Sequence, residues 1–95
     1  MREMNFTSLN YFAALVREKN FTRAAERLHI TQQSLSAHIA GLEREFGCRL
    51  VERSVPLELT YAGRIFLRYA EEIGEMRLSL QRELGDIVEN QKGEL

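Results

Sequence analysis

The chain of 95 residues has few of the residues that build covalent frameworks or stiff linkers: one cysteine, one proline and no tryptophan. Its lone cysteine, Cys48, excludes an intrachain disulfide and is expected to be a small buried hydrophobe. No apolar run approaches the roughly 18–20 residues of a membrane span. The N-terminus has no continuous apolar segment of the kind found in secretory signals, so we expect a cytoplasmic protein without a membrane partner.

Catalytic groups are also scarce. Asp86 is the only aspartate, and neither His29 nor His38 belongs to a cluster with metal-ligand spacing. The sequence has no glycine-rich phosphate loop and no nucleophile elbow. We therefore expect no enzymatic activity, no catalytic residue and no bound metal, which directs attention to binding.

The charge is unevenly distributed along the chain. The net value of −1, taken alone, argues against a nucleic-acid partner. However, residues 1–69 carry ten Lys and Arg against seven Asp and Glu, a balance of +3, whereas residues 70–95 carry three against seven, a balance of −4. Any contact with a polyanion therefore belongs to the first part of the chain.

The segment from Phe21 to Leu42 predicts two short helices packed across a tight turn. Apolar residues recur at helical spacing on one face of each half. Thr31, after the turn, is a good N-cap for the second helix. This pattern is typical of a helix-turn-helix. The apolar positions are Ala24, Ala25 and Leu28 in the first half and Leu35, Ile39 and Leu42 in the second.

The same periodicity predicts a helix before this unit and the start of its first helix. The preceding helix should cover about 7–18, with Thr7 or Ser8 as its cap. Thr22 should cap the next helix, which ends near His29.

Three further elements are predicted after the turn. A helix should cover about 32–46 and end at Gly47, because glycine readily adopts the left-handed conformation. Residues 49–59 predict a small hairpin, or wing. Thr60 should then cap a long helix over about 61–89.

The long helix carries an apolar stripe that a monomer cannot bury. It would extend roughly 43 Å at 1.5 Å per residue, and exposed stripes of this kind mark interaction surfaces. The simplest partner is the same helix of a second copy in a closed two-fold pairing. Gly74 and Gly85 within it suit either a close helix approach or a bend. The predicted dimerisation residues are Phe66, Tyr69, Ile73, Met76, Leu80, Leu84 and Ile87.

The third predicted helix has a thin outer face that suits DNA. Gln32 and Gln33 stand at its N-terminus, where recognition helices contact base edges, and glutamine pairs bidentately with adenine. The short side chains behind them would let the helix settle into a major groove about 12 Å wide. The outward and flanking positions are Gln33, Ser34, Ser36, Ala37, Ala40, Gly41 and Arg44.

Several polar side chains have both a binding and a structural interpretation. Thr22 and Thr31, at helix N-termini, could offer hydroxyl and N–H groups to phosphates. Arg53 could instead pair with Glu52 or Glu58, and glutamines on a surface helix are often merely solvated. The arginines that would add positive charge are Arg23, Arg49 and Arg53.

Taken together, these segments resemble the N-terminal DNA-binding domain of LysR-type transcriptional regulators. The resemblance covers nearly the whole chain and depends on the combination of motifs. They are Leu9-x-Tyr11-Phe12, the run NFTRAAERLHITQ over 20–32, Leu35-Ser36-x-x-Ile39-x-x-Leu42-Glu43, Gly47-x-Arg49-Leu50-Val51-x-Arg53 and Leu59-Thr60-x-Ala62-Gly63.

The resemblance implies a mainly α fold: a winged helix-turn-helix with three helices and a two-stranded wing, followed by a long dimerisation helix. It implies a homodimer, or a dimer of dimers at full length, that binds an imperfect palindrome in double-stranded DNA and regulates transcription in bacteria. No cofactor is expected here, since a small-molecule co-inducer would bind a missing effector domain. The implied DNA contacts are Thr31, Gln32, Gln33, Ser36, Ala37 and Arg53.

The expected domains are a winged helix-turn-helix over 4–63, a linker helix over 61–90 and the start of an effector domain over 91–95. The helix-turn-helix would occupy about 21–42. An alternative function is a winged-helix protein-interaction module, in which the acidic tail would suit a basic partner.

This sequence departs from the family pattern at several positions of the predicted DNA-binding face. Gln33 stands where the family frequently has proline, and Ala37, Ala40 and Gly41 stand where arginine is common. The predicted wing is short and lacks the family's frequent extra arginines. We therefore expect DNA shape and phosphate contacts to take a larger share of recognition.

Overall fold

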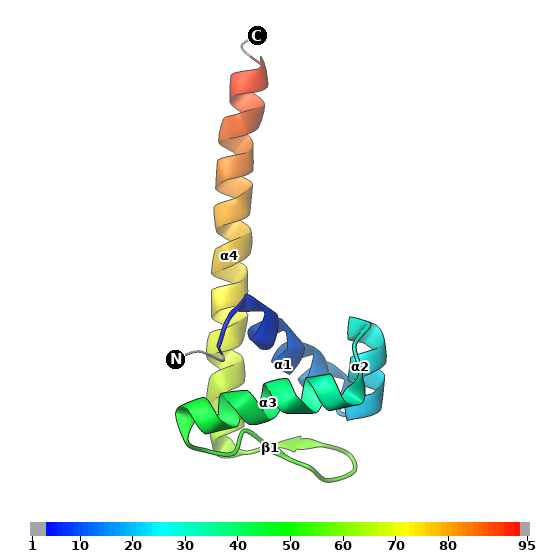
Figure 1. The fold of residues 1–95 in the computed structure, drawn as a ribbon. Coiled ribbons are helices and arrows are strands. Elements are labelled where there is room, and N and C mark those ends of the chain that lie inside the picture. Colours follow the sequence, from blue (N-terminus) through cyan, green and yellow to red (C-terminus); the bar gives the residue numbers. More distant parts are fainter. Residues whose placement is uncertain (1–3, 94–95) are drawn as a thin grey trace.

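A computed structural model describes residues 4–93 and confirms the predicted mainly α, winged helix-turn-helix architecture (Figure 1). The first three helices lie beside the lower part of one long helix, which projects away from them. The molecule measures 56 × 26 × 22 Å. The elements are α1 Phe6–Glu18, α2 Phe21–Leu28, α3 Gln32–Phe46, β1 Val51–Glu52, β2 Glu58–Leu59 and α4 Tyr61–Gly93.

The start of α1 differs from the prediction, because Asn5 caps it rather than Thr7 or Ser8. The Ser8 amide donates to Asn5 Oδ1 at 2.8 Å, and the Asn5 amide donates to Ser8 Oγ at 2.8 Å. This reciprocal pair is a capping box. Ser8 therefore belongs to the first turn of α1, where it is buried.

The cap of α2 was also predicted at the wrong residue. Asn20, not Thr22, is the N-cap, and its Oδ1 accepts the Arg23 N–H at 2.9 Å. Asparagine is at least as good a cap as threonine. α1 ends at Lys19, whose backbone is left-handed with a φ of 54°, and Asn20 is the next residue. Thr22 thus lies inside the first turn of α2, and its hydroxyl donates to Gln32 of α3 instead of capping the helix.

α3 has the predicted bounds. Thr31 Oγ1 accepts the Ser34 N–H at 3.0 Å, and Gly47 ends the helix with a φ of 70°. A left-handed residue at this place is usually glycine, because a Cβ there is strained. After this turn Cys48 is exposed, so its expected burial is wrong.

The core lies between the three short helices, the wing and the first turns of α4. The Phe12 ring packs edge-to-face on Phe66 of α4, with 4.8 Å between centroids. Gly41, predicted to flank the outer face of α3, is buried instead. The largest fully buried apolar side chains are Phe12, Leu15, Leu35, Ile39, Leu42, Leu50 and Val51.

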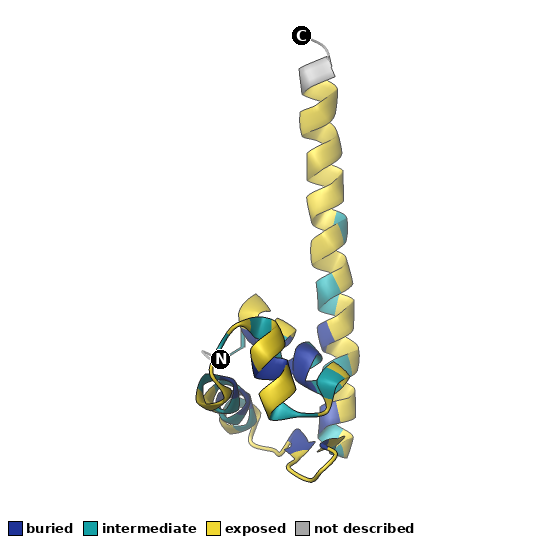
Figure 2. Cartoon of the chain, turned by 90° about the vertical axis from the view of Figure 1, so that its right-hand side faces the viewer, coloured by how far each residue is buried: buried dark blue, intermediate teal, exposed yellow. Residues whose placement is uncertain are grey.

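The C-terminal part of α4 projects beyond the rest of the chain, whereas its N-terminal part packs on the core and Arg77 still lies over the Phe6 ring of α1, 4.8 Å from the centroid. The helix has 33 residues, or about 50 Å at 1.5 Å per residue, and it continues past the predicted end near 89. Ala70 is its last buried residue, and from 80 to 91 every residue is exposed (Figure 2). Of the expected effector-domain segment, 91–93 continue the helix and 94–95 lie outside the described residues. Within 4–93, no helix is both long and apolar enough to cross a membrane.

The wing is joined to the first turn of α4. β1 and β2 pair antiparallel, with Val51 opposite Leu59. The Thr60 hydroxyl donates to the Arg49 carbonyl at 2.6 Å and accepts the Gly63 N–H at 2.9 Å, so Thr60 caps α4 as predicted. Its own amide donates to the Leu50 carbonyl at 3.1 Å. The wing and α4 therefore share one hydrogen-bonded joint.

Gly63 is required at this joint, and Gly63→Ala should lower the free energy of unfolding by roughly 1–3 kcal/mol. A Cβ on Gly63 would collide with the Leu50 carbonyl and approach Leu59 Cδ2 to 3.2 Å. Gly85→Ala is the matched control, because no atom lies within 4 Å of its added Cβ, and alanine should stabilise the helix there by up to about 1 kcal/mol. Thermal unfolding of both variants checks this. Equal midpoints would show that the joint tolerates a side chain.

Candidate nucleic-acid interface

The outer face of α3 begins with polar side chains and continues with short ones. Thr31, Gln32, Gln33 and Ala37 are exposed, and Ser36 is partly exposed. The left-handed turn at His29, with φ 59°, ends α2 and places the start of α3 next to the first turn of α2. The predicted contact residues of α3 are therefore accessible to a partner.

Two of the predicted contact residues bond to each other across the helix-turn-helix. The Thr22 hydroxyl of α2 donates to Gln32 Oε1 of α3 at 3.0 Å. This bond follows from the cap at Asn20, because Thr22 has no capping role that would occupy its side chain. The neighbouring Arg23 is exposed in the same turn of α2.

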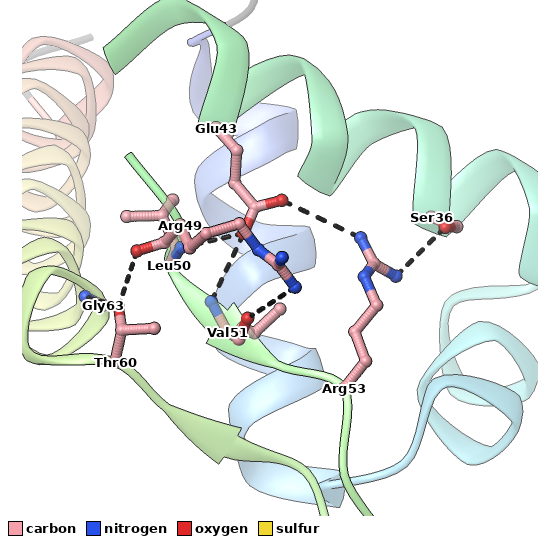
Figure 3. A network of polar contacts seen from close by, with 8 residues as sticks. All are labelled: Ser36, Glu43, Arg49, Leu50, Val51, Arg53, Thr60 and Gly63. Atoms are coloured by element: carbon pink, nitrogen blue, oxygen red, sulfur yellow. Dashed lines mark hydrogen bonds and ion pairs between the residues drawn. The ribbon is translucent and has the colours of Figure 1, made fainter. Parts of the chain in front are cut away.

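Arg53 extends from the wing onto α3. Its Nη1 donates to Ser36 Oγ at 3.2 Å, and its Nη2 lies 3.8 Å from Glu43 Oε1 (Figure 3). The guanidinium also lies over the Phe21 ring, 4.8 Å from the centroid. Arg53 therefore contacts α3 and not Glu52 or Glu58, its two partners suggested by the sequence.

Glu43 is the residue that sequence reasoning missed. Its Oε2 accepts the Leu50 N–H at 2.8 Å and the Val51 N–H at 3.4 Å, where the chain enters the wing. Arg49 Nε lies 3.7 Å from the same oxygen. Only 12% of the Glu43 side chain is exposed, so this carboxylate holds the wing and Arg53 against α3 (Figure 3). Glu43 belongs to the Leu42-Glu43 motif recognised in the sequence, but the sequence does not indicate which groups its carboxylate contacts.

The predicted dimerisation stripe lies along α4. At 100° per residue, the positions from Tyr69 to Ile87 fall within an arc of about 80°. Phe66 differs from the other members, because it is partly buried and packs on Phe12 and on Phe46, at 4.8 and 5.7 Å between centroids. The exposed members are Tyr69, Met76, Leu80, Leu84 and Ile87, and Ile73 is partly exposed.

The lower end of the stripe opens into an apolar groove. The groove is lined by residues of α4 together with Leu9 of α1 and Phe46 at the end of α3. Phe46, the last residue of α3, is 43% exposed here. The lining residues include Met4, Leu9, Phe46, Cys48, Ile65, Tyr69 and Ile73. Stripe and groove together form one continuous apolar surface.

Potential metal-ligating residues are scattered over the part of the chain that the structure describes. In that part of the chain no three His, Cys, Asp or Glu residues are grouped as metal ligands.

A family model described as "Bacterial regulatory helix-turn-helix protein, lysR family" matches residues 6–64. The chain belongs to this family. The region matched by the family model therefore covers all three short helices, the wing and the joint with α4.

Similar members of the LysR family include characterised regulators and DNA complexes. The chain is 52% identical over 63 residues to the HTH-type transcriptional regulator CatR of Pseudomonas putida. The aligned region covers 66% of this chain and 22% of CatR. The structure matches the BenM DNA-binding domain in complex with catB site 1 DNA with a TM-score of 0.76 and 37% identity. That match covers 86% of this chain and 97% of the BenM domain.

A second LysR-family complex gives the same fold. The CbnR DNA-binding domain in complex with DNA matches with a TM-score of 0.79 and 38% identity, over 87% of this chain and 98% of that domain. This chain spans about a fifth of the length of CatR.

Proposed function

We propose that the chain is the DNA-binding part of a LysR-type transcriptional regulator and binds double-stranded DNA as a homodimer on an imperfect palindrome. The observation that carries the proposal is the accessible start of α3, with Thr31, Gln32 and Gln33 exposed beside the first turn of α2. A helix in this setting can enter the major groove. Arg23 and Arg53 would supply charge to the DNA backbone from α2 and from the wing.

The homodimer is supported by α4. Its exposed apolar stripe needs a cover, and a two-fold axis would present two recognition helices to the two halves of a palindrome. The fold similarity to the BenM and CbnR complexes supports the same mode of docking. In this proposal 4–63 bind DNA, 61–90 pair the two chains, and 91–95 lead toward an effector domain that would hold the co-inducer, all in the bacterial cytoplasm.

Binding should weaken steeply with salt, because Lys and Arg displace counterions from the phosphates. We expect the logarithm of the association constant to fall linearly with the logarithm of salt concentration, and Arg23→Gln to reduce the slope by about one per subunit. Arg82→Gln on α4, outside the helix-turn-helix, is the matched control and should leave the slope unchanged. Fluorescence anisotropy with mixed-sequence duplexes measures both. A binding curve that does not change with salt would exclude the proposed interface.

The alternative of a protein-interaction module makes a different prediction in the same experiment. The acidic segment over 70–95 would then dominate binding to a basic partner, and the chain would not be retained on DNA even at low salt. No feature among the described residues favours this alternative over DNA binding.

A further inference from the structure

Two guanidinium groups near the wing share one carboxylate of α3. Arg49 Nε lies 3.7 Å from Glu43 Oε2, and Arg53 Nη2 lies 3.8 Å from Glu43 Oε1 (Figure 3). The carboxylate is mostly buried, whereas 61% of the Arg49 side chain and 38% of the Arg53 side chain are exposed. The three charged groups therefore have a net charge of +1 instead of +2.

Arg53 lies on the face of α3 that is proposed to enter the major groove. Its Nη1 donates to Ser36 Oγ at 3.2 Å, and Ser36 is one of the expected DNA contacts. A guanidinium group has five N–H donors, so the contacts with Ser36 and Glu43 leave donors for a phosphate. What the Glu43 carboxylate reduces at this surface is therefore positive charge and not hydrogen-bonding capacity.

The attraction of a protein to the DNA backbone depends on the positive charge that it brings to the phosphates, because each neutralised phosphate releases condensed counterions. Glu43 Oε1 lies 3.8 Å from the Arg53 guanidinium, well within the Debye length of about 10 Å at 0.1 M salt. A phosphate that approaches Arg53 therefore also meets the negative field of Glu43. Because the carboxylate is mostly buried, salt and water screen this field less than that of an exposed charge.

We propose that Glu43 limits the sequence-independent attraction of the domain to DNA by offsetting about one positive charge per subunit. This inference rests on the proposed DNA binding and deepens it. Non-specific binding is almost entirely electrostatic, whereas base contacts carry the sequence information, so the carboxylate weakens the first more than the second. Glu43 acts through Arg49 and Arg53 and is a positioning residue.

The structural and the electrostatic roles of Glu43 predict opposite effects of Glu43→Gln on binding. Loss of the two ion pairs should lower the unfolding midpoint, whereas loss of the negative charge should raise the affinity for DNA. If Glu43 only supported the wing, the variant would bind DNA more weakly, because a loosened wing would hold Arg53 less well. The direction of the affinity change therefore separates the two roles.

Fluorescence anisotropy with mixed-sequence duplexes compares the parent with three variants. We expect Glu43→Gln to bind roughly 5- to 30-fold more tightly at low salt, with a salt slope steeper by about one per subunit. Glu43→Gln/Arg53→Gln should return the slope to that of the parent, because the local charge is again +1. Glu89→Gln is the matched control with the same change in net charge. It should leave affinity and slope unchanged, because Glu89 is exposed on α4, about 180° around the helix from Leu80.

The folded state of each variant is verified at the temperature of the binding measurement. Glu43→Gln keeps an oxygen that can accept the Leu50 N–H, and circular dichroism and light scattering report its helix content and mass. The same set is also made with Gly85→Ala, where the added Cβ meets no atom within 4 Å and alanine should stabilise the helix. A weakened Glu43 variant can then be measured while it is folded.

Three outcomes would overturn the inference while leaving DNA binding intact. A folded Glu43→Gln could bind no more tightly than the parent, or its salt slope could equal that of the parent. An equal gain in affinity from Glu89→Gln would also contradict it, because net charge alone would then explain the effect. By contrast, a parent that binds no duplex even at low salt would refute the proposed function itself.

Discussion

Leu80→Asp should convert the proposed dimer into a monomer. Leu80 is 57% exposed and lies in the middle of the apolar stripe of α4. A carboxylate placed in a closed helix pair, without a partner, costs several kcal/mol, and two-fold symmetry places one in each chain. A penalty of roughly 6 kcal/mol per dimer would weaken association about 10⁴-fold. Light scattering should then give the 11.0 kDa chain mass instead of twice that value.

Leu78→Asp is the matched control for this experiment. Leu78 is 54% exposed, almost as much as Leu80, but two residues place it about 200° away around the helix. The control should remain dimeric and bind DNA like the parent. A monomeric Leu80 variant would bring one α3 instead of two to the DNA, so the salt dependence of its binding should have roughly half the slope. If both variants remain dimeric, or both become monomeric, α4 does not pair through this stripe.

Glu43→Ala should destabilise the domain by roughly 2–4 kcal/mol, because its removal leaves buried groups without partners. The Leu50 N–H would lose its acceptor at 2.8 Å, and Arg49 and Arg53 would lose their shared counter-charge. At about 4–8 °C per kcal/mol for a domain of this size, the unfolding midpoint should fall by roughly 10–30 °C. Thermal unfolding is compared at one chain concentration, because dimerisation couples to stability.

Two further variants separate the roles of the Glu43 carboxylate. Glu43→Gln keeps an oxygen for the Leu50 N–H but loses the charge, so its destabilisation should be smaller than that of Glu43→Ala. Glu58→Ala, at an exposed position of β2, should change stability by no more than about 0.5 kcal/mol. A Glu43→Ala variant as stable as the Glu58 control would mean that the wing holds its place without this carboxylate.

The helices were predictable because each is encoded within its own segment. The spacing of Leu35, Ile39 and Leu42 gave the inward face of α3, and Thr31 and Gly47 gave both of its ends. The caps of α1 and α2 were misplaced because several good capping residues stand together. The choice of Asn20 over Thr22 depends on where the preceding left-handed turn ends, which is a property of the backbone.

The candidate interface was predictable as a set of residues but not as an arrangement. Nothing in the sequence links Thr22 to Gln32, or Arg53 to Ser36, because these pairs form only after the helices and the wing have packed. The role of Glu43 was missed for the same reason: its partners follow six to ten residues later, around the turn at Gly47. Local periodicity carries no information about such non-local hydrogen bonds.

The joint at Gly63 and Thr60 has a mechanical consequence for the proposed dimer. The wing base is hydrogen-bonded to the first turn of α4. The body proposed to contact DNA, which consists of the three short helices and the wing, should therefore move together with α4 as one rigid unit. A tilt of about 10° around the middle of α4, roughly 25 Å from its end, would displace the body by about 4 Å. That displacement exceeds one base-pair rise of about 3.4 Å. The crossing angle of the two long helices therefore sets which half-site spacing the dimer can span.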